Sequence, residues 1–388
     1  MRGKLLATAI SAMLAVSVVA SGCGGGSKAS DEIKIGVVGE MTGSNATYGT
    51  SMVNGMKLAV KEINDKGGVN GKKINLVVAD DKSEPAEAAN AMSKLINQDK
   101  TPVVMGIFTS SNAIAAANVS EAAKVPFLAI GATNPKVTLD EKTGKVKPNT
   151  FRVCFIDPFQ GTVGANFVLN ELKLKKAVVF VDNSSDYSKG LASFFKQAYT
   201  SKGGEIVGEE AYLQKDTDFK ATLTKIKASN PDMIYVPGYY QEVGMIVKQA
   251  REMGLNVPMA GGDGWDSAKL PEIAGKAALN NTYFSSLYSP DDDSKLNKDF
   301  VAAYQKAYNE KPDVFAALAY DSALLVINAI KSANALDTVK IKDAMAKTAG
   351  FSGVSGNVTF NEQHNPVKSA VIIEYKDGAQ VFKTKINP

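Results

Sequence analysis

The feature that most constrains the fold is a regular alternation of short apolar runs with amphipathic stretches. The run IKIGVVG (33–39) has the composition of a buried strand, and residues 50–65 place apolar side chains at helical spacing. The run KINLVVAD (73–80) follows, and runs at 102–108 and 126–132 continue the pattern. Such alternation is typical of parallel sheets covered by helices. We therefore expect an α/β protein.

A second series of the same kind begins near FRVCFI (151–156). Its other expected strands are 177–181, 205–212, 233–239, 258–262 and 282–288, separated by helices near 159–172, 187–201, 217–229 and 241–253. After it come helical stretches at 293–309, 313–334 and 338–347 and a β-rich tail at 356–386. The chain of 388 residues is long enough for two domains, so we expect each series to form its own parallel sheet.

The beginning of the chain has the features of a bacterial secretion signal. Arg2 and Lys4 precede an apolar run at 5–20, which is short for a membrane-spanning helix. The sequence ASGC (20–23) resembles a lipobox, although the usual leucine three positions before the cysteine is an alanine here. We expect a signal peptide at 1–22.

Lipidation of Cys23 is the expected consequence of cleavage at the lipobox. Residues 23–30, which include GGGS, would then act as a flexible tether. The alternative is a signal without lipidation and a cysteine that stands there by chance.

The sequence lacks the motifs of several common chemistries. His364 is the single histidine, and no CxxC pair exists, so a multi-histidine or zinc-ribbon metal centre is not expected. Phosphate-loop and dinucleotide motifs are absent, and GVSGN around Ser355 does not complete a G-x-S-x-G motif. We expect no catalytic residue, metal or cofactor, and a surface position for His364. Cys154 is expected to be a buried apolar residue.

Charge also argues against a nucleic-acid partner. The chain carries 44 basic and 40 acidic residues, a net charge of +4, and the lysines are spread along the sequence. A nucleic-acid-binding face would instead need a cluster of basic residues.

Polar residues follow the expected strands of the first series, where ligands of parallel sheets bind. Ser110 lies in TSSN (109–112) at the start of an alanine-rich helix, and the exposed amides of a helix start suit a carboxylate. These residues could equally serve only to cap the helix. In GATNP, Thr133 offers a hydroxyl group and Gly131 allows a ligand to approach its backbone.

The strand ends of the second series carry aromatic rings and a carboxylate. Tyr187, Tyr239 and Asp263 each follow an expected strand, and Tyr48 lies in the polar loop after the first strand of the chain. An anion-accepting half would thus face a cation-accepting half, which is what a zwitterion needs, because either charge is costly to bury unpaired. Trp265, two residues after Asp263, would either wall the ligand's side-chain pocket or pack near the hinge.

Several longer segments resemble a known family. They are residues 39–85, GATNP, DYSKG and residues 239–255, YYQEVGMIVKQAREMGL. The chain resembles the type I periplasmic binding proteins of ABC importers, and more narrowly the leucine/isoleucine/valine-binding family. The resemblance implies two Rossmann-like lobes joined by three crossover hinge strands. It places 31–152 plus 285–355 in lobe 1, and 153–284 plus 356–388 in lobe 2.

The family also implies roles for the site residues. Ser110, Gly131 and Thr133 would hold the ligand's α-carboxylate and ammonium groups, Tyr48, Tyr187 and Tyr239 would line the cleft, and Asp263 would take the ammonium group. Many relatives have glutamate at the position of Asp263.

The implied function is that of a monomeric, lipid-anchored, extracytoplasmic binding protein. It would capture an amino acid, leucine, isoleucine or valine by default, through hinge closure and deliver it to an ABC permease. Alternatives are another small amine, acid or amide, such as an aromatic amino acid, or a ligand-sensing receptor for a membrane signalling partner.

Overall fold

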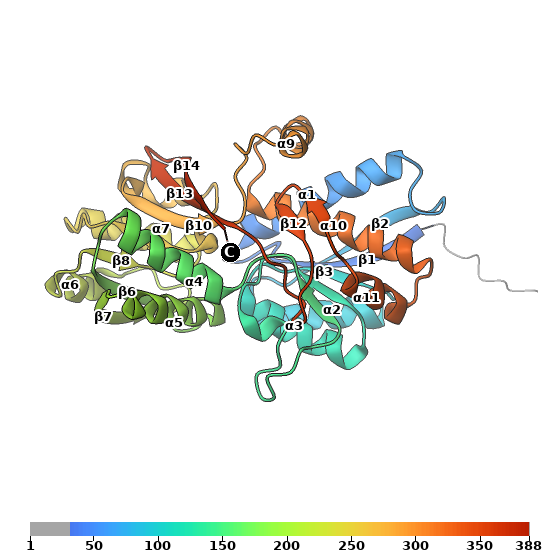
Figure 1. Ribbon diagram of the computed structural model, residues 1–388, viewed down its shortest axis with the longest axis horizontal. Helices are drawn as coiled ribbons and strands as arrows, with labels where there is room; N and C mark the ends of the chain where they lie inside the picture. The colour runs from blue at the N-terminus through green and yellow to red at the C-terminus, as the bar shows by residue number, and fades with distance from the viewer. Residues whose placement is uncertain (1–31, 388) are drawn as a thin grey trace, which may run out of the picture. The chain divides into compact units, whose positions relative to one another are not determined.

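The computed structural model describes residues 32–387, which are organised by two main β-sheets (Figure 1). The expected signal peptide, the lipobox and Cys23 lie outside these residues. The first sheet has the order β2-β1-β3-β4-β5. Its strands are β1 (Glu32–Gly39), β2 (Lys73–Asp80), β3 (Val104–Gly106), β4 (Phe127–Ala129) and β5 (Thr150–Arg152).

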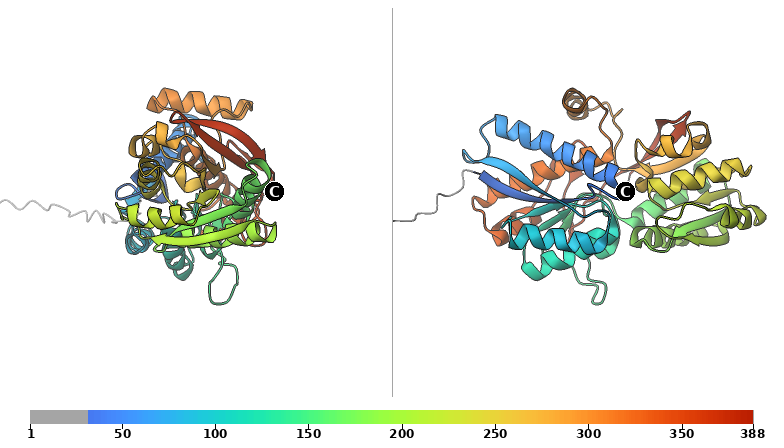
Figure 2. Two further views of the ribbon diagram at one scale, coloured as in Figure 1. Left: turned by 90° about the vertical axis from the view of Figure 1, so that its left-hand side faces the viewer. Right: turned by 180° about the vertical axis from the view of Figure 1, so that it is seen from behind.

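Helices cover both faces of this parallel sheet, and we call the sheet with its helices the first lobe. Ile33, Ile35 and Val37 of β1 belong to one apolar cluster with α1, whereas Val38 belongs to another with α2 and α3. This alternation follows from the period of two along a strand. Figure 2 (right) shows α1 in blue on one side of β1 and α2 and α3 in cyan on the other. The helices are α1 (Ala46–Asp65), α2 (Pro85–Asn97) and α3 (Ser110–Ala123).

The second sheet has the order β14-β13-β10-β9-β8-β6-β7, and with its helices we call it the second lobe. Five strands are parallel, and β13 joins them antiparallel to β10. The strands are β6 (Lys176–Asp182), β7 (Glu205–Tyr212), β8 (Met233–Tyr235), β9 (Met259–Gly261), β10 (Thr282–Ser286), β13 (Ala370–Lys376) and β14 (Ala379–Ile386). The helices are α4 (Asp157–Asn166), α5 (Asp186–Ser201), α6 (Lys220–Ala228), α7 (Tyr240–Glu252) and α8 (Leu270–Ala274).

Both sheets reverse their strand order at an internal strand. In the first lobe β1 lies between β2 and β3, and in the second lobe β6 lies between β7 and β8. A crevice forms at such a reversal beyond the carboxyl ends of the strands, where ligands bind. The strand order therefore predicts that a ligand binds beside the loops that follow β1, β3, β6 and β8.

The chain crosses between the lobes three times, after β5, after β10 and after β12. Between the second and third crossings come α9 (Lys295–Tyr308), α10 (Val314–Ala333), α11 (Thr338–Ala346) and the small β11 (Phe351–Gly353) and β12 (Gly356–Val358) sheet. Helix α10 packs against α1 and β3 of the first lobe. The expected α/β class with two parallel-sheet lobes and three crossovers is confirmed.

Two expectations were wrong in detail. The apolar run FRVCFI was assigned to the second series, but β5 pairs in parallel with β4 of the first lobe. A run of apolar residues indicates a strand but not the sheet that receives it. His364 is half-buried rather than exposed, because its ring stacks on Phe151 at a centroid distance of 4.1 Å and its Nδ1 lies 3.0 Å from the Thr150 carbonyl oxygen. Cys154 is fully buried, as expected.

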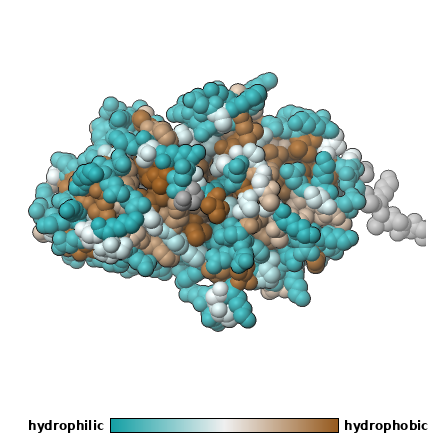
Figure 3. All heavy atoms as spheres, viewed as in Figure 1, coloured by the Kyte–Doolittle hydropathy of each residue, from teal (hydrophilic) through white to brown (hydrophobic). Residues whose placement is uncertain are grey.

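Helix α10 is long and apolar enough to cross a membrane by length and composition alone. Most of it is buried in the fold, and Leu318 and Val326 have no exposed surface. On the face seen in Figure 3, hydrophobic residues lie in separate patches among hydrophilic ones. The position of α10 in the core of the first lobe accounts for its apolar sequence.

Candidate ligand-binding site

The first lobe presents hydroxyl groups at the ends of β3 and β4. Ser110 begins α3, and its Oγ accepts a hydrogen bond from the backbone N–H of Asn134 at 3.3 Å. Thr133 follows β4, and its buried hydroxyl group makes no hydrogen bond among the described residues. Gly131 lies under the Phe108 ring, and a Cβ atom there would come within 1.8 Å of a ring carbon. Only glycine therefore allows Phe108 to occupy this position.

Glu40, at the end of β1, holds the turn that presents Ser110. One of its carboxylate oxygens, Oε1, accepts hydrogen bonds from the backbone N–H groups of Phe108 at 2.9 Å and Thr109 at 2.8 Å, and from the Thr109 hydroxyl at 3.0 Å. Burial raises the pKa of Glu40, although these hydrogen bonds oppose the shift. Sequence reasoning missed this residue, because an acid after a strand does not reveal which amides it will meet.

The second lobe presents the carboxyl group of Asp263 directly after β9. Its Oδ1 accepts hydrogen bonds from the Tyr187 hydroxyl at 2.9 Å and from Gln160 Nε2 at 2.8 Å. Burial raises the pKa of Asp263 to about 6, against the effect of these two hydrogen bonds. Near neutral pH the group is therefore a buried carboxylate with no cation among its hydrogen-bond partners. A cationic ligand group would stabilise it.

Aromatic rings from both lobes meet at these loops. Tyr187 stacks on Tyr239, with ring centroids 5.1 Å apart and planes at 15°. Tyr48 contacts Tyr239 edge to face at 6.1 Å and lies 4.3 Å from Phe315. Phe315 in turn contacts Phe108 at 4.1 Å. All five rings are buried, so they form an apolar wall beside the polar groups.

Phe108 and Phe315 were not expected from the sequence. Phe108 directly precedes TSSN at the carboxyl end of a strand, which is a signal that could have been used. Phe315 lies on α10, far along the chain from Tyr48. The two rings come into contact only through the packing of the folded chain, which the sequence does not reveal.

Trp265 is fully buried and its indole N–H donates to the Val236 carbonyl oxygen at 2.8 Å. A Cβ atom at Gly261 would come within 2.1 Å of the indole nitrogen, so this glycine makes room for the ring. The indole is thus satisfied within the second lobe. Of the two roles that the sequence left open, this placement favours packing over a pocket wall.

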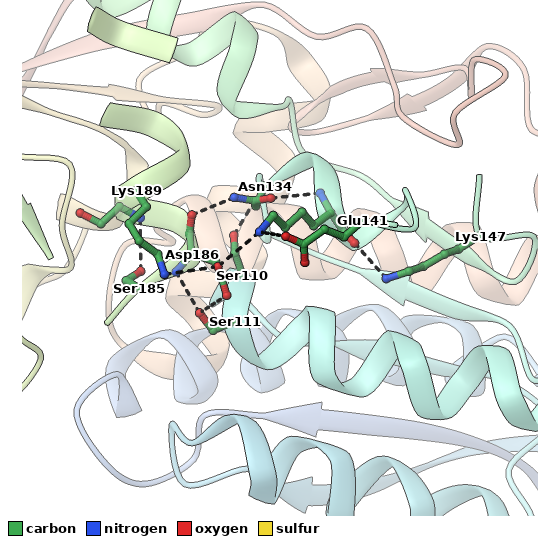
Figure 4. A network of polar contacts seen from close by, with 10 residues as sticks. Ser110, Ser111, Asn134, Glu141, Lys147, Ser185, Asp186 and Lys189 are labelled. Atoms are coloured by element: carbon green, nitrogen blue, oxygen red, sulfur yellow. Dashed lines mark hydrogen bonds and ion pairs between the residues drawn. The ribbon is translucent and has the colours of Figure 1, made fainter. Parts of the chain in front are cut away.

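Direct contacts bring the two halves of the site together. The Tyr48 hydroxyl of the first lobe donates to the Gly264 carbonyl oxygen of the second. At the start of α5, Asp186 Oδ2 accepts from the Ser111 hydroxyl at 3.2 Å, and its carbonyl oxygen accepts from Asn134 Nδ2 at 2.8 Å (Figure 4). Hydroxyl groups and helix-start amides from one lobe therefore face a carboxylate and tyrosines from the other.

The arrangement suits a small zwitterion with an apolar side chain. The hydroxyl groups and the start of α3 can receive a carboxylate, and Asp263 can receive an ammonium group. Within residues 32–387, no group of three or more histidine, cysteine, aspartate or glutamate side chains is arranged to hold a metal ion.

Comparisons with known proteins agree with this geometry. The profile of the family described as "Periplasmic binding protein" matches residues 32–380. The branched-chain amino acid transporter substrate binding protein of Streptococcus pneumoniae, solved in complex with isoleucine, is 42% identical with a TM-score of 0.86. The match covers 92% of this chain and 100% of that one.

Two further relatives extend the comparison. An amino acid binding protein of Pseudomonas aeruginosa is 31% identical over 97% of this chain and 96% of its own length. A solute binding protein from R. palustris, solved in complex with benzoate, is 26% identical with a TM-score of 0.82 and covers 92% of this chain and 97% of its own. The chain therefore belongs to the periplasmic binding protein family, as a type I solute-binding protein of ABC transporters from the branched-chain amino acid group.

Proposed function

We propose that this protein captures a branched-chain amino acid outside the cytoplasmic membrane and delivers it to an ABC permease. A lipid on Cys23 would anchor it, residues 23–30 would act as its tether, and the protein would work as a monomer. Binding would close the two lobes about the crossovers, because only the closed form allows both lobes to contact the ligand.

The main support is the buried carboxylate of Asp263. It already accepts two hydrogen bonds and still has a raised pKa, so the protein keeps a negative charge where a bound ammonium group would neutralise it. Ser110 and Thr133 stand on the opposite lobe, where an α-carboxylate would find hydroxyl groups and helix-start amides. This pairing supports a ligand with both groups on one carbon.

The apolar wall supports a branched aliphatic side chain. Tyr48, Phe108 and Phe315 pack against one another with centroid distances of 4.1 to 5.9 Å and offer no charged group to a ligand side chain. The related protein in complex with isoleucine supports the same class. We therefore expect isoleucine, leucine and valine to bind more tightly than polar amino acids.

A second candidate is a simple aromatic acid, because a related structure contains benzoate. The acidic side chain of Asp263 argues against it, since two negative charges would be buried in one site. An aromatic amino acid keeps the ammonium group and is compatible with Asp263, so side-chain size would decide between it and isoleucine.

Thermal unfolding of the soluble fragment 24–388 in the presence of the twenty amino acids, benzoate and sugars would test the proposal. Ligand at about a hundred times its dissociation constant adds roughly 2.7 kcal/mol of stability. We expect the largest increase in Tm from isoleucine, leucine or valine, and its loss in Asp263→Ala. Stabilisation by benzoate alone, or by amino acids equally in Asp263→Ala, would contradict the proposed site.

A further inference from the structure

Several buried polar atoms around Asp263 have no hydrogen-bond partner. They are the hydroxyl oxygens of Thr133 and Tyr235, the side-chain carbonyl oxygen of Gln160 and both carboxyl oxygens of Asp157. Each of these residues is at most 1% exposed. Buried polar groups are normally paired, and every atom in this cluster is an oxygen that can accept a hydrogen bond. The two hydroxyl groups can also donate, but the carbonyl oxygen of Gln160 and both carboxyl oxygens of Asp157 have no donor among the described residues.

Asp157 lies where the first crossover enters the second lobe. Its backbone N–H donates to the Thr133 carbonyl oxygen at 3.0 Å, so it stands beside the residue expected to bind the ligand. A Cβ atom at Gly190 of α5 would lie 3.0 Å from Asp157 Oδ2, so the carboxyl group also approaches the helix that carries Tyr187. Asp157 is therefore placed between the two halves of the site.

The buried charges around Asp157 are unbalanced. The Arg152 guanidinium, which has no exposed surface, donates to the Ala132 carbonyl oxygen at 2.8 Å and the Thr138 hydroxyl at 3.1 Å, but to no carboxylate. Asp157 and Asp263 are both buried, and the charge of Asp263 is close enough to raise the pKa of Asp157. If both carboxyl groups are ionised, one more positive charge is needed beyond that of Arg152.

We propose that Asp157 is a second carboxyl contact for the ligand's ammonium group, so that Asp157, Asp263 and the Thr133 hydroxyl surround it. The inference rests on the proposed function, because it requires an amino acid ligand. With the ammonium group in place, two positive charges face the two side-chain carboxylates, while the ligand's own carboxylate would be bound by the hydroxyl groups and amides at the start of α3. The N–H donors of the ammonium group also satisfy acceptors that have no other partner.

The proposal implies that binding releases a proton. Burial raises the pKa of Asp157 to about 8, although the nearby Thr133 hydroxyl opposes the shift without making a hydrogen bond of normal geometry. Facing Asp157 are Arg152 and Cys154 from its own crossover, together with the second-lobe residues Tyr187, Tyr235 and Asp263. At pH 7 the ligand-free Asp157 is mostly protonated, and an ammonium group beside it favours ionisation.

The test is isothermal titration calorimetry with L-isoleucine and with 3-methylpentanoate, which has the same carbon skeleton without the amine. Asp157→Asn should weaken isoleucine binding by about tenfold or more, the usual effect of losing a hydrogen bond to a charged group. It should leave 3-methylpentanoate binding equal or tighter. Asp182→Asn is the matched control, because Asp182 is a buried acid of the second lobe whose carboxyl group accepts hydrogen bonds from Ser184, outside the proposed site.

A second readout measures the protons released on binding by the wild-type protein and by Asp157→Asn. Titrations in phosphate and in Tris at pH 7, whose ionisation enthalpies differ, should report the release of up to one proton with isoleucine, and Asp157→Asn should abolish most of it. An equal loss of affinity for both ligands, or unchanged proton release in Asp157→Asn, would overturn the inference alone. Wild-type protein that binds no amino acid would overturn the proposed function and this inference with it.

Discussion

At the scale of single residues, the Tyr187–Asp263 hydrogen bond sets the charge of the site. The Tyr187 hydroxyl donates to Asp263 Oδ1 and also accepts from the backbone N–H of Gly264 at 3.2 Å. The donated hydrogen bond favours the charged carboxyl group and so lowers its pKa against the larger effect of burial. Tyr187 therefore helps to keep Asp263 ionised when no ligand is bound.

Replacing Tyr187 by phenylalanine should make amino acid binding dependent on pH in the neutral range. Without the donor, the pKa of Asp263 rises above about 6 and the carboxyl group is partly neutral at pH 7. We expect isoleucine binding to weaken by about tenfold at pH 7 and by less at pH 8, where the group ionises again. Titration calorimetry at both pH values measures this. Tyr199 lies at the far end of α5, and its hydroxyl donates to the Leu174 carbonyl oxygen outside the site, so Tyr199→Phe should change neither value.

Glu40 makes a different kind of contribution, because it holds backbone rather than ligand. Glu40→Ala would leave the N–H groups of Phe108 and Thr109 and the Thr109 hydroxyl without an acceptor in a buried site. Each buried donor left without an acceptor costs about 1–3 kcal/mol. We therefore expect urea titration to show that the free energy of unfolding decreases by about 3 kcal/mol. Glu40→Gln keeps an acceptor oxygen and should lose less. Equal stability of the two variants would contradict this role.

The sequence could predict which residues lie at strand ends, but not what each of them contacts. Ser110, Thr133 and Asp263 stand at the carboxyl ends of strands, as the alternating pattern predicts, because parallel strands end at the same edge. Asp157 begins a helix after a crossover, and Phe315 lies on a helix from a distant part of the chain. Nothing local in the sequence marks such residues, since their positions depend on how the lobes are joined.

At the scale of elements, the start of α5 in the second lobe makes polar contacts with the first lobe. Asp186 Oδ2 accepts from the Ser111 hydroxyl, and Lys136 of the first lobe lies 3.8 Å from Asp186 Oδ1. Figure 4 shows Asp186 and Ser111 beside Ser110, at the start of α3. None of these contacts requires a ligand. They therefore contribute to the free energy of closing the lobes and not to the choice of ligand.

Asp186→Ala should consequently weaken all ligands by the same factor. We expect a loss of about two- to fivefold, the usual size for a partly exposed charged contact, with an unchanged ratio of the dissociation constants for isoleucine and valine. Small-angle scattering of the ligand-free variant should indicate a more open average form. Lys196→Ala is the control, because Lys196 lies on the same helix but pairs with Glu209 of its own lobe. This variant should neither weaken ligand binding nor open the ligand-free form. A change in the ligand ratio would place Asp186 in the binding site instead.

Elements differ in how far the sequence predicts them. Helix α10 was expected at 313–334 and is found at Val314–Ala333, because a long amphipathic or apolar helix carries many repeats of one pattern. Strand β5 has three residues, and its neighbour in the sheet is decided by pairing with β4 rather than by its own composition. The short crossovers are therefore the least predictable part of this fold, although they determine how the lobes meet.

At the scale of the whole molecule, the ligand-free protein contains buried acids whose charge is unfavourable. Burial raises the pKa of Asp157 to about 8 and that of Asp263 to about 6, and it raises the pKa of Asp81, Asp266 and Asp313 as well. An unfolded chain would ionise each of these groups near pH 4. The folded protein thus holds more protons than the unfolded chain between pH 4 and 8.

This difference predicts that the ligand-free protein becomes more stable as the pH falls from 8 to 6. The free energy of unfolding decreases with rising pH wherever the folded state binds more protons. One group that stays protonated only in the folded state contributes at most about 1.4 kcal/mol per pH unit. For Asp157, that gives roughly 2 kcal/mol between pH 8 and 6. We therefore expect Tm to rise by several degrees over this range in protein freed of ligand by unfolding and dialysis.

Two comparisons make the prediction specific to the site. Asp157→Asn removes one titrating group and should reduce the rise in Tm without abolishing it, because the pKa of Asp81 is also raised to about 8, whereas Lys196→Ala on the surface should leave the rise unchanged. Saturating isoleucine should also reduce or reverse the rise, because a bound ammonium group favours the ionised acids and binds more tightly at higher pH. A ligand-free Tm that falls from pH 8 to 6 would show that other groups dominate the titration. The stability of the empty protein and its affinity for an amino acid would then not be linked through these carboxyl groups.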